Sequence, residues 1–316
     1  EVTPRIQKTK NRTYSCELIK ITGIKLGTFV ILSNSIYINI ESTKKTYILP
    51  NYLIKKIYAR RRFHMKTAIE IFMKSGKSYF INFPNQNSLR ILQKLVLSDS
   101  IYIEKDDPSI SFSTSGITEK WLKGELSNFG YLMRLNMASG RSFNDSSQYP
   151  FFPWILCNYE SEEIDLTDIN NYRDLSKPIG AVNEDRLTKL YQRMNDLLKN
   201  SKQADYYLYS SFAICPLSLY LYLFRMEPFT KLHIEMQSGK FDHPSRLFSS
   251  ISNTYGLVST HINDYRELIP EFYFSPEFLM NDNELDLGFS KGIQINHVDL
   301  PRWSNNSSIE CVCLFI

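Results

Sequence analysis

The chain has 316 residues, which is long enough for two or three domains and a sizeable apolar core. Its composition, 43% hydrophobic and 22% charged, excludes a disordered or collagen-like polypeptide. Residues 1–108 contain 19 lysines and arginines against 8 acidic residues, and residues 109–316 contain 18 against 25, so the net charges are +11 and −7. Opposite charges on adjacent halves predict two domains that attract each other, although the basic half would equally suit an anionic membrane or nucleic acid.

The cysteines argue against a disulfide framework or a zinc site. They are widely spread, and no CxxC pair or Cys/His ligand spacing joins them: Cys16, Cys157, Cys215, Cys311 and Cys313. This pattern favours a reduced, cytoplasmic setting. No G-x-S-x-G, H-E-x-x-H or G-x-G-x-x-G motif occurs either. We therefore expect no catalytic residues, no metal and no cofactor.

The first hundred residues predict a small β domain. Strands are expected where β-branched and aromatic residues gather or alternate, at 29–40 (with a turn at 33–35), 47–58, 68–73 and 78–83. The last two strands form a hairpin around Gly76. A helix follows from Asn87 to Leu97. Antiparallel strands closed by one helix predict a small barrel or sandwich.

The rest of the chain predicts helices separated by long irregular segments. Residues 98–117, rich in Ser, Thr and Asp, form the expected linker. Helices are expected from Thr118, from Ser127 to a stop at Gly140, and at about 183–200. The uncharged segment 206–224 is near membrane-spanning length, but its tyrosines, serines and proline favour a buried core segment.

A series of motifs runs through this second half in a fixed order. It comprises WLKGELSNFGYLMRLN at 121–136, ASGRSFND at 138–145, QYPFFPW at 148–154, RDLSKPIG at 173–180, RMEPF at 225–229, GKFDHPSRLF at 239–248, ELIPEF at 267–272, PEFL at 276–279 and DLG at 286–288. This series resembles the BEACH domain. The first half, with CEL at 16–18, RRRF at 60–63, TAIEIF at 67–72 and FINFP at 80–84, resembles the pleckstrin-homology-like (PH-like) domain that precedes BEACH in that family.

The resemblance implies an α+β fold, in which a PH-like β-barrel or sandwich with a C-terminal helix precedes a mainly helical BEACH domain with extended segments. The boundaries that we expect are an N-terminal tail at 1–13, the PH-like domain at 14–97, the linker at 98–117 and the BEACH domain at 118–316.

Two departures from the family pattern stand out. The family's tyrosine–glycine–small–histidine–tyrosine element falls at 209–213, where its glycine and histidine are replaced. The similarity also fades at 303–309, and residues 310–316 look unlike the family. We expect the domain to be incomplete at this end, with its final helices and the family's WD-repeat propeller belonging to the full-length protein. Because the chain starts at Glu1 and not at Met, we also expect preceding residues.

The strongest electrostatic feature is a basic run in the PH-like half, for which three interpretations stay open. The run could dock on the acidic BEACH half, bind anionic lipid, or form a solvated strand face. The resemblance favours docking, because it implies that this domain type packs on BEACH and generally lacks a lipid-headgroup pocket. The expected docking residues are Lys55, Arg60, Arg61, Arg62 and Lys66.

An aromatic and proline-rich cluster is where we expect partner proteins to bind, in a groove at the junction of the two domains. Residues of these types more often belong to a core, so packing inside the BEACH domain is the other interpretation. They are Trp121, Phe129, Tyr131, Tyr149, Phe152 and Trp154.

The resemblance implies a non-enzymatic scaffold in vesicle trafficking, lysosome-related organelle biology or autophagy. Its partners would be other proteins, with weak peripheral association with endomembranes and no nucleic acid. A phosphoinositide- or anionic-membrane-binding module is the alternative. Asp242 and His243 together suggest an acid/base pair, but no motif supplies a nucleophile, so we interpret them as a structural pair.

Overall fold

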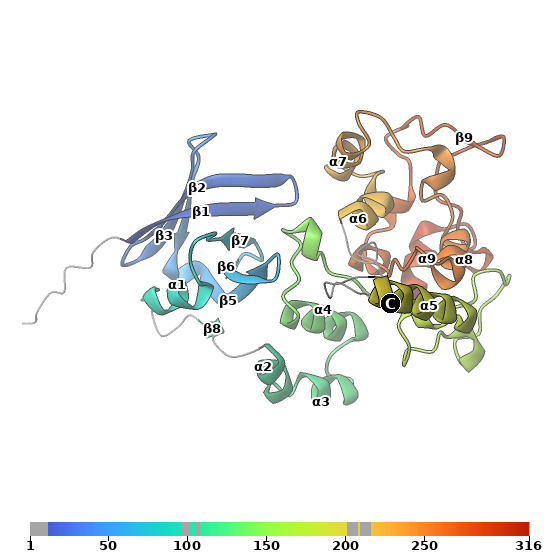
Figure 1. Ribbon diagram of the computed structural model, residues 1–316, viewed down its shortest axis with the longest axis horizontal. Helices are drawn as coiled ribbons and strands as arrows, with labels where there is room; N and C mark the ends of the chain where they lie inside the picture. Colours follow the sequence, from blue (N-terminus) through green and yellow to red (C-terminus); the bar gives the residue numbers. More distant parts are fainter. Residues whose placement is uncertain (1–11, 96–101, 105–107, 201–207, 209–215, 316) are drawn as a thin grey trace, which may run out of the picture. The chain divides into compact units, whose positions relative to one another are not determined.

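The computed structural model describes residues 12–95, 102–104, 108–200, 208 and 216–315 (Figure 1). The chain divides into two compact units. Unit 1 consists of Glu1–Leu126 with Arg134–Asp145, and unit 2 of Ser127–Met133 with Ser146–Ile316. The division passes through a single helix, α4 (Asn128–Ala138).

Unit 1 is built on a curled antiparallel sheet of seven strands, blue to cyan in Figure 1, joined by a short parallel eighth strand. The order across the sheet is β4-β3-β2-β1-β7-β6-β5-β8. The strands are β1 (Arg12–Lys20), β2 (Gly23–Ile31), β3 (Ser35–Ile40), β4 (Thr46–Pro50), β5 (Ile54–Arg62), β6 (Met65–Met73), β7 (Ser78–Asn82) and β8 (Tyr102–Glu104). This PH-like sheet confirms the first part of the predicted α+β fold.

Alternating side chains explain why these segments form strands. Along β3 every second residue is apolar and buried, at Ile36, Ile38 and Ile40, and Leu18, Phe29 and Ile81 of other strands belong to the same core of unit 1. Helix α1 (Ser88–Lys94) adds its own apolar residues to the same core. The predicted 68–73/78–83 hairpin is confirmed as β6 and β7.

The segment that the sequence predicts as a linker contains a strand and a helix. Strand β8 pairs with β5 and is too short to show an alternating pattern, but its Ile103 packs against the core. Helix α2 (Pro108–Thr114) is rich in Ser and Thr, which usually indicates a loop. Here Ser113 and Thr114 donate to the Ile110 carbonyl in their own helix, so the hydroxyls are satisfied without leaving it. Helix α3 (Ile117–Leu122) follows.

Unit 2 is mainly helical, with long irregular segments between its helices. Its core is aromatic, with Trp154, Tyr222, Phe248, Phe272 and Phe278 fully buried. The regular elements are α5 (Glu184–Asn200), α6 (Pro216–Leu223), α7 (Phe229–Met236), α8 (Ile251–Thr260), α9 (Ser308–Phe315), β9 (Phe289–Ser290) and β10 (Ile293–Gln294).

Short 3₁₀ turns punctuate both units. They are η1 (Asn51–Leu53), η2 (Ser146–Gln148), η3 (Ile169–Asn171), η4 (Ile179–Ala181), η6 (Pro244–Arg246), η7 (Pro270–Tyr273), η8 (Pro276–Leu279) and η9 (Arg302–Ser304). Several begin at prolines of the motifs quoted above, because proline suits the first position of a helical turn.

The predicted helix ends at 127–140 and 183–200 are confirmed. Ser127 Oγ accepts from the Gly130 amide at 3.1 Å, and Gly140, at φ 88°, ends the helix after Ala138. Asn183 Oδ1 accepts from the Arg186 amide at 2.8 Å at the start of α5.

The apolar segment 206–224 is described only in part. Within it, the residues of α6 are largely buried. Among the described residues, no helix combines the length and apolar character needed to cross a bilayer. The departure at 209–213 lies outside the described residues.

The C-terminal residues that look unlike the family contribute to the core of unit 2. Cys311, Val312 and Phe315 of α9 are buried. The Phe315 ring lies 5.7 Å from that of Phe272, centroid to centroid. The unfamiliar sequence at this end therefore still supplies a packed helix.

Candidate functional site

The basic run of β5 separates into buried and exposed side chains. Arg60 is 3% exposed and Arg62 is 7% exposed, whereas Lys55, Arg61 and Lys66 are exposed. Strand alternation puts Arg60 and Arg62 on the opposite side from Arg61, despite a register irregularity between them. A buried arginine needs hydrogen-bond partners for its guanidinium, and both find partners within unit 1.

Arg60 joins β6 to the end of α4. Its Nε lies 2.9 Å from Glu70 Oε2, and both side chains are almost fully buried. Its Nη1 donates to the Met137 carbonyl at 2.8 Å. Met137 is in the last turn of α4, where carbonyls lack helical partners and the helix dipole favours a cation. Arg60 therefore satisfies a strand carboxylate and a helix end together.

Glu70 uses its second oxygen to hold the segment that follows α4. Ser142 Oγ donates to Glu70 Oε1 at 2.6 Å, and Asn144 Nδ2 lies 3.3 Å from the same oxygen. Asn144 Nδ2 also donates to Ser78 Oγ at 2.7 Å. A carboxylate in the middle of a sheet thus accepts hydrogen bonds from an arginine, a serine and an asparagine, which offset the cost of burying it.

Arg62 forms a second buried ion pair, with Asp145. Asp145 is 2% exposed and ends the Arg134–Asp145 part of unit 1. We define the β5–β6 polar network as the contacts made by six side chains: Arg60, Arg62, Glu70, Ser142, Asn144 and Asp145. Together they join the sheet to residues 134–145.

Lys56 extends this network at its edge. Its Nζ donates to Tyr58 Oη at 2.9 Å and lies 3.5 Å from Met137 Sδ. Burial, with the charge of Arg134 as the next cause, lowers the pKa of Lys56 to about 8. The helix end at Met137 is thus contacted by two cationic side chains of the same strand.

Of the five predicted docking residues, the structure brings Arg60 and Arg62 together on residues 134–145. It leaves Lys55, Arg61 and Lys66 at the surface. Sequence reasoning missed Glu70, Ser142, Asn144 and Asp145. Glu70 carries a usable signal, since an acidic residue inside the apolar run 68–73 indicates a buried partner.

The aromatic residues predicted to bind partners are distributed over the two units, and they differ in how far they are buried. Tyr149, Phe152 and Trp154 are buried in unit 2, so packing accounts for them. The Phe152 ring lies 4.8 Å from Tyr273 and 5.4 Å from Phe129. The other members are half-buried: Phe129 and Tyr131 in unit 2, and Trp121 in unit 1. A partner-binding role for this set stays a prediction.

Motif residues of unit 2 form buried polar contacts that hold its irregular segments. Glu267 Oε1 lies 3.3 Å from Arg173 Nη1, and Glu267 Oε2 accepts from the Trp154 amide at 2.9 Å. Arg225, 1% exposed, donates to the carbonyls of Asn296 and Phe248 at 2.9 and 2.8 Å. These charged groups act on loop backbone and are enclosed by the fold.

Asp242 and His243 form part of a surface turn. Asp242 Oδ1 accepts from the His243 amide at 2.7 Å and pairs with Arg246, while His243 Nδ1 lies 2.8 Å from Ser245 Oγ. These contacts fit the structural interpretation of the pair. In the described part of the chain, no three His, Cys, Asp or Glu side chains gather in a way that would hold a metal ion.

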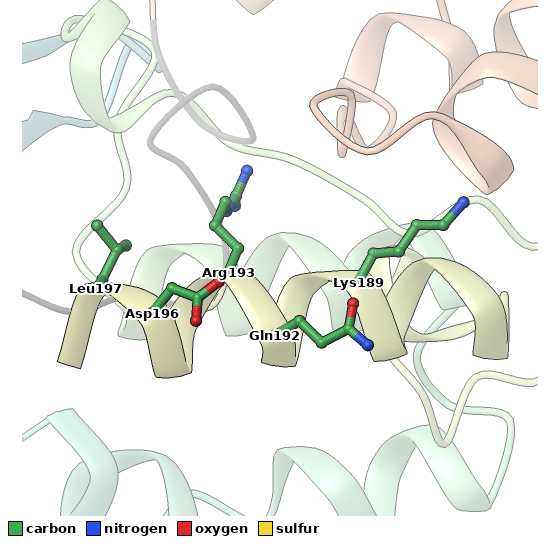
Figure 2. A pocket seen from close by; sticks show the side chains of 5 residues that line it. All are labelled: Lys189, Gln192, Arg193, Asp196 and Leu197. Carbon is green, nitrogen blue, oxygen red and sulfur yellow. The ribbon is translucent and has the colours of Figure 1, made fainter. Parts of the chain in front are cut away.

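A surface depression lies along α5. Figure 2 shows the side chains that line it, all from this one helix: Lys189, Gln192, Arg193, Asp196 and Leu197. Lysine and arginine stand beside one carboxylate here, without a histidine, cysteine or serine that would act as a nucleophile with its base.

Two family models match the chain. The "Beige/BEACH domain" model matches residues 119–314, and the "PH domain associated with Beige/BEACH" model matches residues 41–96. The first match corrects the expectation that the similarity fades at 303–309, because it continues through most of α9. A short helix with few polar residues carries too little pattern to be identified by inspection.

Among curated relatives, the BEACH domain-containing protein lvsE of Dictyostelium discoideum is 40% identical over 274 residues. The alignment covers 84% of this chain but 12% of that protein, so the chain spans a small part of the relative's length. Among solved structures, the C-terminal domain of an unknown protein from Leishmania infantum aligns with 14% identity and a TM-score of 0.24, over 26% of this chain and 76% of that one.

The motif series, the PH-like sheet followed by a helical unit, and a family match over more than half of the residues agree. The chain belongs to the BEACH-domain family and combines a BEACH-type PH domain with a BEACH domain.

Proposed function

We propose that this chain is a non-enzymatic protein-binding scaffold, and that the PH-like sheet and residues 134–145 act as one structural piece within it. The β5–β6 polar network is the observation that supports this proposal. It uses Arg60, Arg62 and Glu70 for internal contacts. Because these three charged side chains are engaged in internal ion pairs and hydrogen bonds, they are not available for catalysis or for binding a soluble ligand.

By its family, the scaffold would act in membrane trafficking, with vesicle, lysosome-related or autophagic pathways as the expected setting. It would bind other proteins and lie at the cytoplasmic face of endomembranes. Trp121, Phe129 and Tyr131 are the side chains that we propose for partner contact, since half-buried aromatics anchor protein interfaces.

The alternative is an anionic-membrane-binding module that uses the basic run. Burial of Arg60 and Arg62 counts against it, because each would have to leave an ion pair to reach a headgroup. Lys55, Arg61 and Lys66 are exposed and remain the residues on which this alternative would depend.

Proximity labelling in cells tests the scaffold proposal. The protein containing this chain would be fused to a labelling enzyme and compared with a variant that carries Phe129→Ser and Tyr131→Ser. We expect wild type to enrich a defined set of trafficking proteins and the variant to lose them. A variant with Lys55→Gln and Lys66→Gln is the matched control, and it should retain the same set.

Two outcomes would contradict the proposal. One is a wild-type labelling pattern no different from that of the freely diffusing labelling enzyme. The other is loss of the set in the lysine control but not in the aromatic variant, which would favour the membrane alternative. Circular dichroism of the purified chains would establish that each variant folds.

A further inference from the structure

A two-stranded hairpin in unit 2 holds large apolar side chains in solvent. Its strands β9 and β10 pair Phe289 with Gln294 and Ser290 with Ile293. Phe289 is 64% exposed and Ile293 is 74% exposed. In Figure 1 the hairpin, labelled β9, reaches away from the helices of unit 2. Its two largest apolar side chains therefore contribute little to the core of this unit.

The base of the hairpin is fixed to unit 2. Leu287 and Ile295, which flank the two strands, are buried. The Ile295 amide donates to the Gly288 carbonyl at 2.9 Å, which continues the pairing of the strands to this end. A Cβ added to Gly288 would lie 2.8 Å from Pro244 Cγ, so the base also packs closely against η6. The hairpin is thus held at its base, and the exposed apolar pair lies beyond it.

A two-residue turn forms the tip of the hairpin. Lys291 and Gly292 have φ angles of 50° and 79°, and a type I′ hairpin turn requires positive φ at both of these positions. Both residues are exposed. The tip therefore carries one cationic side chain, which lies between the two apolar residues in the sequence.

The two apolar side chains lie on opposite faces of the hairpin. Successive residues of a strand point to opposite sides, and Ser290 lies directly across from Ile293. Phe289 therefore shares one face with Gln294, and Ile293 lies on the other face. Binding to a flat protein surface would cover one face and leave the other apolar side chain in water. A lipid layer surrounds an inserted hairpin and covers both faces.

The charges around the hairpin suit a membrane contact that depends on apolar burial. Residues 287–298 contain no Asp or Glu, and Lys291 is their one Lys or Arg. A lysine beside an inserted apolar group keeps its ammonium at the headgroups while its methylene stem lies deeper. The preceding loop carries the exposed Asp282, Glu284 and Asp286, so the region has no net positive charge to attract anionic lipid.

We propose that the β9–β10 hairpin inserts Phe289 and Ile293 into the interfacial layer of a lipid membrane. The hairpin is separate in the sequence from the basic run of β5, on which the anionic-membrane alternative depends. Insertion adds a membrane contact to the endomembrane location proposed above and requires no partner protein. Vesicle binding therefore tests it apart from the scaffold proposal.

Sedimentation of the 316-residue chain with phosphatidylcholine vesicles tests the hairpin. We expect the chain to bind these vesicles, which carry no net charge, with little change on added salt. Phe289→Ser with Ile293→Ser should weaken binding by about 10- to 30-fold, because both changes remove apolar surface that insertion buries. The control, Ile169→Ser with Ile309→Ser, removes side chains that are 78% and 64% exposed elsewhere in unit 2 and should bind like wild type.

Phe289→Trp measures insertion directly. With vesicles present, difference spectra against wild type should show the introduced indole emitting at shorter wavelength and quenched by lipids with brominated acyl chains. Lys291→Glu on this background puts a carboxylate at the tip and should reduce both signals, because a carboxylate has no long stem with which to reach the headgroups. Lys291→Gln should keep most of both signals.

Absence of wild-type binding to the vesicles, or equal loss in the hairpin variant and its control, would overturn the proposal. Lack of quenching by brominated lipid would do the same. Without vesicle binding, self-association that needs Phe289 and Ile293 would identify a second copy of the chain as the occupant. Again without vesicle binding, loss of the proximity-labelled proteins in the hairpin variant would identify a partner protein. Circular dichroism would verify that each variant folds.

Discussion

Arg60 and Arg62 in unit 1 differ from Arg225 and Arg186 in unit 2 in what their buried guanidinium groups bind. In unit 1, Arg60 and Arg62 pair with the carboxylates of Glu70 and Asp145. In unit 2, Arg225 donates to loop carbonyls and to no carboxylate among the described contacts. The sheet already satisfies most of its own backbone, so its arginines are free to bind side chains. Irregular segments leave carbonyls without partners, and a buried guanidinium supplies the missing donors.

Arg186 shows the same use in unit 2. It donates to the Val258 carbonyl at 2.6 Å and to the His261 carbonyl at 3.2 Å, and it also contacts the Ile179 carbonyl. One side chain thereby ties together α8, the loop after it and η4. Arg225 and Arg186 thus use their charge to stabilise irregular backbone, whereas Arg60 and Arg62 join separate segments of the chain through carboxylates, as Arg173 does with Glu267 in unit 2.

Removing Arg225 should have the largest effect. Arg225→Met removes a buried donor from the Phe248 carbonyl and a part-buried donor from the Asn296 carbonyl, and we expect the free energy of unfolding of unit 2 to fall by about 3–5 kcal/mol. Hydrogen exchange measured by mass spectrometry on peptides from α6 would report it. Arg302→Met is the control: its partner Glu162 is exposed, and the loss should stay below about 0.5 kcal/mol. Equal losses of unfolding free energy in Arg225→Met and Arg302→Met would contradict the claim that Arg225 stabilises the buried loop backbone.

A glycine pair sharpens the contrast between sheet and helix. At Gly27 on β2, an added Cβ would lie 2.1 Å from the Asn39 carbonyl oxygen, so Gly27→Ala should destabilise unit 1 by about 2–3 kcal/mol. Gly256 in α8 has open space around it, and Gly256→Ala should stabilise unit 2 by about 0.5–1 kcal/mol. Exchange rates in peptides from β2–β3 and from α8 measure both. Destabilisation of unit 2 by Gly256→Ala would contradict the expectation that alanine fits at this helical position and favours the helix.

His233 makes part of unit 2 sensitive to acid. It is fully buried, and its Nε2 accepts from the Asp242 amide at 3.3 Å, which requires an unprotonated nitrogen. Burial lowers the pKa of His233 below its usual 6.5. The unfolded chain therefore binds more protons than the folded one as the pH falls below about 6.5, and stability falls with it.

We expect His233→Gln to flatten this loss of stability between neutral pH and the lower folded-state pKa, as followed by urea denaturation at a series of pH values. His243→Gln, on the exposed turn, is the matched control and should leave the slope unchanged. If the free energy of unfolding of the His233→Gln variant fell with pH as steeply as that of wild type, His233 would not be the cause of the acid sensitivity.

The sequence predicts part of unit 1 because its physics is local. Alternating apolar residues identify the end of β2 at 29–31, β3, β6 and β7, and the turn at Gly76 sets the pairing of β6 with β7. Strand β1 and most of β2 were not predicted. Strand β8 could not be predicted, since three residues contain too little pattern and its pairing with β5 depends on the rest of the sheet.

The candidate site was predictable only in part. The run at 60–62 is visible in the sequence, but which arginines are buried depends on strand alternation together with partners far along the chain, at 137 and 145. In unit 2, the motif arginines are recognisable by family resemblance, yet their carbonyl partners belong to segments without a periodic pattern, such as that around Asn296.

A double-mutant cycle on Arg62 and Asp145 tests the central claim most directly, namely that buried charge joins residues 134–145 to the sheet. Arg62→Met, Asp145→Leu and the double variant would be compared with wild type by hydrogen exchange in peptides covering 134–145. We predict that the two changes are non-additive, with a coupling energy of at least about 1 kcal/mol. Additive effects, or unchanged protection of 134–145 in all three variants, would contradict the account.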